Sequence, residues 1–88
     1  MSFQIQLSQR AAKDLDRLSR DTQERILKRL EQLSKSPHDA RLSAQLTQQH
    51  GLRKSRVGGW RIIFTVDAGS ETVNAVTIER RGQVYQRL

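Results

Sequence analysis

Cationic side chains are concentrated in one short segment of the sequence. Arg53, Lys54, Arg56 and Arg61 surround the dipeptide Gly58-Gly59. Like charges that face each other across two strands destabilise a sheet, unless an anion offsets the repulsion. Arginine suits such an anion when it is a phosphate, because its planar fork binds two phosphate oxygens at once. The segment therefore predicts a phosphate-binding surface, with RNA as the leading ligand.

The two adjacent glycines predict a two-residue hairpin of type I′, in which both turn residues have positive φ. With that loop three pairs lie directly opposite each other: Val57 and Trp60, Arg56 and Arg61, Lys54 and Ile63. Opposite residues share a face of the sheet, and successive residues alternate between faces. Lys54, Arg56 and Arg61 therefore share one face, and Arg53 points to the other. The alternative is that solvent and nearby acids simply screen these charges.

A second group of candidate residues ends the chain: Arg80, Arg81 and Tyr85. A four-residue turn at 67–70 would place Val76 opposite Arg61, and alternation would then put Arg80 on the cationic face. On their own, these residues are equally consistent with a solubilising tail and an amphipathic edge. Combined with the hairpin, they predict the second half of one site.

The elements that must position these residues follow from hydrophobic periodicity. Alternation predicts strands at 3–7, 52–57, 60–66 and 72–79, and the tail 82–88 could add a short edge strand. Ser8 suits the N-cap of a first helix, and a second helix is expected to start near Asp21, with Glu24 completing a capping box, and to end before Pro37. The resulting order β-α-α-β-β-β is an α+β fold with a mainly antiparallel sheet, covered on one face by a helical hairpin.

Two parts of this pattern have more than one interpretation. The second helix carries an apolar stripe of Ile26, Leu27, Leu30 and Leu33. Such a stripe could bind a partner or lie on a membrane, but a small sheet needs a cover, and this is the favoured interpretation. Residues 38–51 are polar, and their two leucines, Leu42 and Leu46, could dock a single helical turn. The basic residues of both helices interleave with acids, as is typical of a solvated helix surface.

Composition limits the class of protein. With 88 residues the chain is expected to form a single domain, residues 1–88, and 35% hydrophobic residues are enough for a small core. The net charge of +7 indicates a polyanionic partner. The absence of cysteine excludes disulfides and thiolate metal sites, and no N-terminal apolar run predicts a signal peptide or membrane span. A cytoplasmic protein without metal or cofactor is expected.

The order of elements and two motifs resemble the RelE/ParE toxin superfamily, and within it the RelE-like branch. The motifs run from Leu52 to Phe64, with the core Arg56-Val57-Gly58-Gly59-Trp60-Arg61, and from Ile78 to Tyr85. The resemblance implies a type II toxin that a cognate RelB-like antitoxin neutralises in a hetero-oligomer. RelE-branch toxins cleave mRNA in the ribosomal A site, whereas ParE-branch toxins inhibit DNA gyrase without chemistry of their own. A plain nucleic-acid-binding module is a third possibility.

The resemblance also implies roles for individual residues. By position, Arg61, Arg81 and Tyr85 match the RelE catalytic residues, and Lys54 falls where a catalytic lysine often lies. Arg53, Arg56 and Arg80 are further expected contacts to RNA phosphates. Leu52 stands where RelE enzymes often have a second basic residue, which leaves Lys54 as the candidate general base. His38 and His50 fall in the polar segment, away from the cationic strands, and are not expected to be catalytic.

Overall fold

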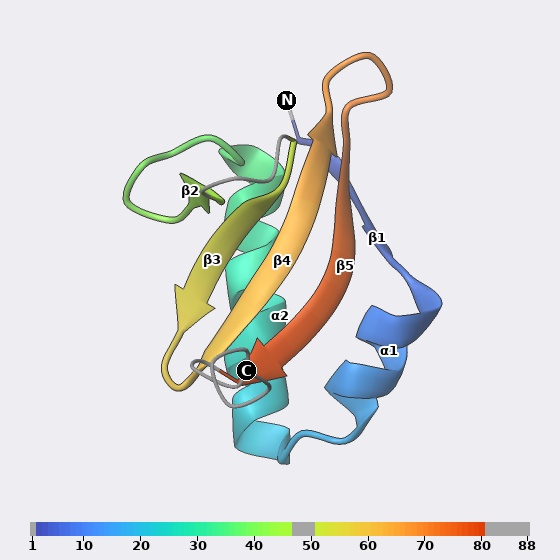
Figure 1. Ribbon diagram of the computed structural model, residues 1–88, viewed down its shortest axis with the longest axis vertical. Coiled ribbons are helices and arrows are strands. Elements are labelled where there is room, and N and C mark those ends of the chain that lie inside the picture. The colour runs from blue at the N-terminus through green and yellow to red at the C-terminus, as the bar shows by residue number, and fades with distance from the viewer. Residues whose placement is uncertain (1, 47–50, 81–88) are drawn as a thin grey trace.

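The computed structural model describes residues 2–46 and 51–80, which form one sheet and two helices (Figure 1). In chain order the elements are β1 (Gln4–Leu7), α1 (Gln9–Asp16), α2 (Arg20–Lys35), β2 (Ala44–Gln45), β3 (Arg53–Val57), β4 (Trp60–Asp67) and β5 (Thr72–Arg80). The sheet has the strand order β1-β5-β4-β3-β2. Only β1 pairs in parallel, with β5, and the other three pairs are antiparallel. The predicted α+β class and mainly antiparallel sheet are confirmed.

A serine side chain caps the N-terminus of each helix. The hydroxyl of Ser8 accepts a hydrogen bond from the backbone N–H of Ala11, 2.9 Å away, as predicted for an N-cap. Ser19 does the same for α2 by accepting from Thr22. The helix therefore begins at Arg20, one residue before the predicted position, and the predicted capping box with Glu24 is wrong because Ser19 is the N-cap. The second helix ends at Lys35, two residues before Pro37.

The segment between α2 and β3 contains a strand that the sequence did not predict. Ala44 and Gln45 pair with Lys54 and Arg53 and extend the sheet by the short strand β2. One turn of helical hydrogen bonding does surround Leu42, because the backbone N–H groups of Leu42 and Ser43 both donate to the carbonyl of Asp39, at 2.9 and 3.0 Å. Leu42 does pack against the core, as a partly buried side chain.

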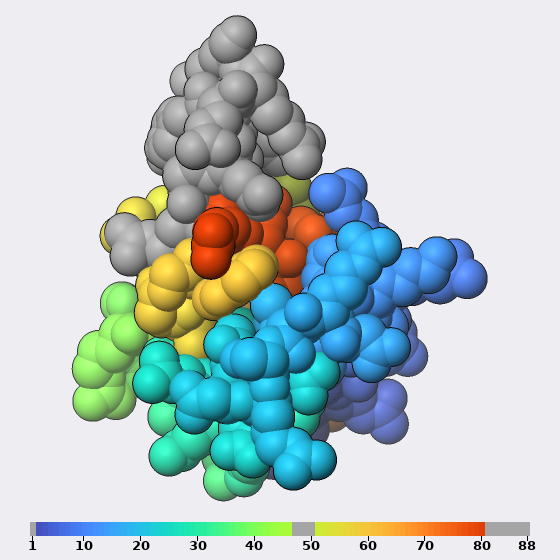
Figure 2. Space-filling view, turned by 90° about the horizontal axis from the view of Figure 1, so that it is seen from below, coloured from blue at the N-terminus to red at the C-terminus, as the bar shows by residue number. Residues whose placement is uncertain are grey.

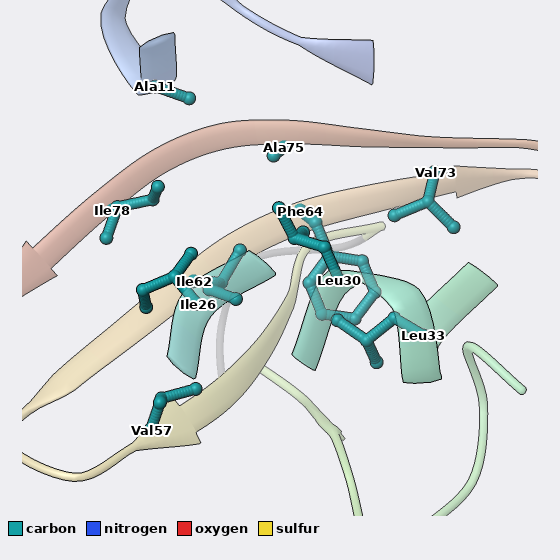
Figure 3. Close-up of a cluster of buried hydrophobic side chains, with 10 residues drawn as sticks. All are labelled: Ala11, Ile26, Leu30, Leu33, Val57, Ile62, Phe64, Val73, Ala75 and Ile78. Atoms are coloured by element: carbon teal, nitrogen blue, oxygen red, sulfur yellow. The ribbon is translucent and has the colours of Figure 1, made fainter. Parts of the chain in front are cut away.

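The core lies between α2 and one face of the sheet (Figure 3). It consists of Ala11, Ile26, Leu30, Leu33, Val57, Ile62, Phe64, Val73, Ala75 and Ile78. Figure 1 shows α2 running behind β3 and β4, while α1 lies beside β5. Leu27 does not join its neighbours on the predicted stripe, because its side chain is 50% exposed. None of the helices in residues 2–46 and 51–80 is long and apolar enough to cross a lipid bilayer.

A β-bulge changes the register between β4 and β5. Phe64 pairs with Ala75 but Ile63 pairs with Thr77, so Val76 has no partner on β4. The turn covers residues 68–71 and not the predicted 67–70, because Asp67 already pairs with Thr72. Together these shifts place Glu79, and not Val76, opposite Arg61, so the predicted pairing is wrong. Bulges flip the alternation of a strand, and this one reverses the faces on which residues 77–80 lie.

β1 pairs with β5 only as far as Ala75, and the residues of β5 after Ala75 lie next to Ser8 and helix α1 instead. The Ser8 hydroxyl donates to the backbone carbonyl of Val76. Beyond that point, Asp14 Oδ2 accepts from the backbone N–H of Ile78 at 3.0 Å and from the Thr77 hydroxyl at 2.9 Å. Ile78 and Thr77 are both buried. A single carboxylate therefore satisfies two donors that have little access to water.

Replacing Asp14 with alanine is expected to lower the free energy of unfolding by about 1–3 kcal/mol, since it leaves these two buried donors without an acceptor. Urea denaturation measures the loss. Asp16→Ala is the matched control, because Asp16 is an exposed residue of the same helix and should change stability by less than about 0.5 kcal/mol. Equal losses in the two variants would contradict the structural role of Asp14.

Candidate functional site

The β3–β4 hairpin has the register that the sequence predicts. Val57 pairs with Trp60, Arg56 with Arg61, and Lys54 with Ile63. Only Gly58 of the two turn glycines has a positive φ, +58°, which is the pattern of a type II′ turn and not of the predicted type I′. Both turns twist the strands in the same sense, so the pairing is unaffected. Lys54, Arg56 and Arg61 thus lie on the sheet face away from α2, called here the cationic face.

Arg61 is held by an acid that the sequence analysis did not consider for the site. Its Nη2 and Nε donate to Glu79 Oε2 at 2.7 and 3.1 Å across the β4–β5 ladder. The side chains of Arg61 and Glu79 are only 18% and 20% exposed. Charge-assisted hydrogen bonds of this length fix the guanidinium in place and neutralise much of its charge. The incorrect register for β5 is why Glu79 was missed.

Arg61 has Glu79 opposite it on β5 and Arg56 opposite it on β3. It therefore lies between an opposite charge and a like charge. The attraction to Glu79 offsets part of the Arg56–Arg61 repulsion. The alternative prediction, in which a nearby acid screens these cations, therefore holds for Arg61. Lys54 and Arg56 make no ion pair within residues 2–46 and 51–80. These two side chains carry the charge that a ligand on this face would meet.

The other predicted contacts lie away from this face. Arg53 points to the α2 side, as alternation predicts, and donates to the hydroxyl of Ser43 at 2.9 Å. Arg80 pairs with Trp60, and its guanidinium lies 5.4 Å from the centre of the Trp60 ring. This contact is a cation–π interaction on the helix side of the sheet. The register argument that put Arg80 on the cationic face is therefore wrong.

Three candidate residues cannot be placed. Arg81, Tyr85 and His50 lie outside the described residues, as does the predicted edge strand at 82–88. His38 is exposed in the turn that follows α2, and Leu52 is a partly buried residue just before β3. Within residues 2–46 and 51–80, no three His, Cys, Asp or Glu side chains come together in a way that could hold a metal ion.

Within residues 2–46 and 51–80, two pockets beside the sheet contain candidate residues. One of about 560 Å³ lies where α1, the start of α2 and the ends of β4 and β5 meet, the end of the molecule seen in Figure 2. Its charges are mixed, since Arg10, Arg17 and Arg80 share it with Asp14 and Glu79. The other, of about 380 Å³, lies along the edge of β3 and includes Lys54 and Arg56. It adds two cations that the sequence analysis did not assign to the site, Arg29 and Arg41.

The guanidinium of Arg41 forms a two-pronged ion pair with Asp39 in the loop that forms one wall of the β3-edge pocket. Its Nη2 and Nε donate to the two carboxylate oxygens at 3.0 and 3.3 Å, and its backbone N–H donates to Oδ1 at 2.9 Å. The side-chain hydrogen bond, followed by the backbone bond, lowers the pKa of Asp39 below its ordinary value of 3.8. The same contact raises the pKa of Arg41.

An NMR titration is expected to show Asp39 protonating below pH 3.8. In Arg41→Gln the pKa of Asp39 should rise, because the side-chain hydrogen bond that lowers it most is lost. The rise should be only partial, because the backbone N–H of residue 41 still donates to the carboxylate. Since the folded pKa is depressed, the ion pair contributes to stability above the ordinary pKa and loses that contribution as pH falls through the folded value. Arg20→Gln is the control, and an Asp39 pKa that does not change in Arg41→Gln would exclude this cause.

Solved structures with the same fold include RelE toxins. The isolated E. coli RelE toxin superposes with a TM-score of 0.79 at 20% identity, covering 98% of this chain and 94% of RelE. The RelBE2 toxin–antitoxin complex from Mycobacterium tuberculosis gives 0.81 at 20% identity, with 92% and 100% covered. The RelE–RelB complex from Pyrococcus horikoshii OT3 gives 0.77 at 20% identity, with 94% and 99% covered. The fold is therefore that of the RelE toxins.

Sequence comparison identifies the family. The model for the ParE toxin of type II toxin–antitoxin systems, parDE, matches residues 5–85. No curated protein sequence matches this chain. The chain belongs to the ParE toxin family of type II toxin–antitoxin systems, and the predicted membership of the RelE/ParE superfamily, with a RelE-like fold, is confirmed.

Proposed function

We propose that this toxin is a ribosome-dependent endoribonuclease that acts in the cytoplasm and cleaves mRNA in the ribosomal A site. The observation that carries the proposal is the cationic face, where Lys54, Arg56 and Arg61 stand side by side on two paired strands. No helix or strand of residues 2–46 and 51–80 covers this face (Figure 1). Three cations on one face of a sheet suit the phosphates of a single RNA strand.

The proposed reaction is attack of a ribose 2′-oxygen on the neighbouring phosphorus. The bond from phosphorus to the 5′-oxygen of the next nucleotide breaks, leaving a 2′,3′-cyclic phosphate and a free 5′-hydroxyl. The 2′-hydroxyl loses a proton to a base, for which Lys54 is the candidate, and the leaving 5′-oxygen gains one. Arg56 and Arg61 bind the phosphate and stabilise the charge that develops on its oxygens. Side chains supply every step, so the mechanism needs no metal ion.

The remaining roles fall to residues outside the described part of the chain. Arg81 is proposed to stabilise the leaving 5′-oxygen or to protonate it indirectly, and Tyr85 to stack on or hydrogen-bond to the reacting nucleotide. Glu79 adds a requirement that the sequence analysis did not include, because a phosphate must compete with this carboxylate for Arg61. Orientation of the mRNA by the ribosome would supply the alignment that the toxin alone lacks, which explains dependence on the ribosome.

A RelB-like antitoxin is the proposed protein partner, in a toxin–antitoxin hetero-oligomer. Structural neighbours of this chain include toxins solved in complex with RelB, from Pyrococcus horikoshii OT3 and Methanococcus jannaschii. The net charge of +7 favours an antitoxin with an acidic segment that folds upon binding.

Inhibition of DNA gyrase is the second candidate function, and the matching family model favours it because that model describes a ParE toxin. Inducible expression separates the two. Mapping of mRNA 5′ ends is expected to show cuts at a fixed position within codons, and co-expression of the antitoxin should abolish them. Intact mRNA together with DNA damage would support gyrase inhibition instead, and rapid cleavage of naked RNA by the pure protein would contradict ribosome dependence.

A further inference from the structure

A second group of cations surrounds the outer edge of β3. The pocket of about 380 Å³ there, called here the edge pocket, is lined by Arg29, residues 40–44, Lys54 and Arg56. Four of these eight residues are cationic and none is acidic. Figure 1 shows why they meet: the segment that leads from α2 to β2 loops beside β3, and α2 lies behind it. Residues of three separate segments thus form one basic pocket.

Arg29 is the residue of this pocket that the fold holds most firmly. From α2, its Nη1 donates to the Ser55 hydroxyl at 2.8 Å and to the Arg56 backbone carbonyl at 2.7 Å. Its Nε donates to Gln32 Oε1 at 3.0 Å. Nη2 donates to no atom of residues 2–46 or 51–80. A guanidinium already fixed in this way loses little conformational entropy when it binds a ligand.

Three of the four charges of the edge pocket, those of Arg29, Lys54 and Arg56, are not neutralised as that of Arg61 is. All three acceptors of Arg29 are neutral, and Lys54 and Arg56 make no ion pair with a described residue. The fourth cation, Arg41, is paired with Asp39, which is not among the lining residues. Bringing three uncompensated cations to one pocket costs free energy, which an anionic ligand would offset. The arrangement is therefore that of an anion site.

We propose that the edge pocket binds a second RNA phosphate, adjacent in the strand to the phosphate at Arg61. The inference rests on the proposed ribonuclease function and names the path of its substrate. Arg56 borders both positions, because it pairs with Arg61 and lines the pocket. Neighbouring strands lie about 5 Å apart, so the pocket is about one to two strand widths from Arg61. Adjacent phosphates of a single strand are separated by a comparable distance.

Binding of a short 2′-O-methyl RNA, which cannot be cleaved, tests the pocket by fluorescence anisotropy. Arg29→Gln is expected to weaken binding about tenfold, as the loss of a charge-assisted contact implies. The slope of log K against log salt should fall by about 0.7, the value for one phosphate of a single strand. Arg20→Gln is the matched control, since it removes the same charge from the same helix about 2.5 turns away, on the opposite side.

A second measurement leaves the protein unchanged, because Arg29→Gln also removes the bonds to Ser55 and Arg56. Oligonucleotides with one uncharged methylphosphonate linkage report on each phosphate in turn. Wild-type protein is expected to lose affinity for substitution at two adjacent linkages. Arg41→Gln changes an exposed residue at the pocket wall. In this variant the loss of affinity should be smaller for substitution at one of the two linkages and the same as in wild type for substitution at the other.

Three results would overturn the proposal. One is sensitivity of the wild-type protein to a single linkage only, and another is equal affinity of the Arg29→Gln and Arg20→Gln variants. The third is weaker binding of a polyglutamate peptide by Arg29→Gln with RNA binding unchanged, which would assign the pocket to an acidic protein partner. In each case the unmodified RNA still binds wild-type protein in a salt-dependent way. Loss of that binding altogether would instead contradict the proposed function.

Discussion

Replacing Arg61 with alanine is expected to lower the rate of ribosome-dependent mRNA cleavage by about 100- to 1,000-fold, the usual effect of removing one donor that stabilises a developing negative charge. The guanidinium of Arg61 is held on the cationic face by two hydrogen bonds to Glu79 and is 18% exposed, so a phosphate must compete with this carboxylate to reach it. Single-turnover cleavage on programmed ribosomes measures the rate.

The controls for this variant follow from the ion pair. Arg61→Ala leaves the Glu79 carboxylate without its partner, so urea denaturation must show that the protein is still folded at the assay temperature. Arg20→Ala removes the same charge far from the cationic face and should cleave like wild type. Glu79→Gln frees the charge of Arg61 and is expected to raise RNA affinity, an effect that Arg61→Ala abolishes. Unchanged cleavage in Arg61→Ala would remove this residue from the mechanism.

Replacing Leu33 with alanine is expected to lower the free energy of unfolding by about 2–5 kcal/mol, because it removes a fully buried side chain and leaves a cavity. A domain of this size is expected to have a total stability near the lower end of the usual range of about 5–15 kcal/mol. The variant should therefore be partly unfolded at physiological temperature. Circular dichroism during urea denaturation measures the change.

The chain offers a closely matched control for this prediction. Leu27 is the same residue type on the same helix, but its side chain is 50% exposed. Leu27→Ala should change stability by about 0.5 kcal/mol or less. A large loss in Leu27→Ala would mean that this side chain is covered in solution, for example by a second copy of the chain.

Local chemistry was enough to predict the hairpin and its cationic face. Two adjacent glycines between alternating strands leave few other registers, and the pairing of Arg56 with Arg61 followed directly. The turn type was not predictable in the same way, because type I′ and type II′ both accept two glycines and both give this register. The Ser8 cap followed from the sequence for the same local reason.

The register of β5 was not predicted because a bulge depends on tertiary packing. The sequence nevertheless contains a sign of the bulge: the apolar residues Val73, Ala75 and Ile78 all face the core, although their spacing changes from two residues to three. Reading that change as a bulge would have placed Glu79 on the same face as Arg61, and the turn at 68–71 supplies the rest of the shift that sets the two residues opposite each other. The same limit applies to Arg29, which looked like a solvated helix residue until the fold brought Ser55 and Arg56 to it.

The contacts of α1 with β5 also bear on aggregation. An exposed strand edge presents unpaired backbone groups that can recruit another chain. Beyond Leu7 the strand β1 no longer covers β5, but Ser8 occupies the carbonyl of Val76 and Asp14 occupies the N–H of Ile78. A second molecule cannot add a strand there without displacing both side chains. The helix thus protects this edge of β5 from strand addition, at the end of the strand where Glu79 holds Arg61.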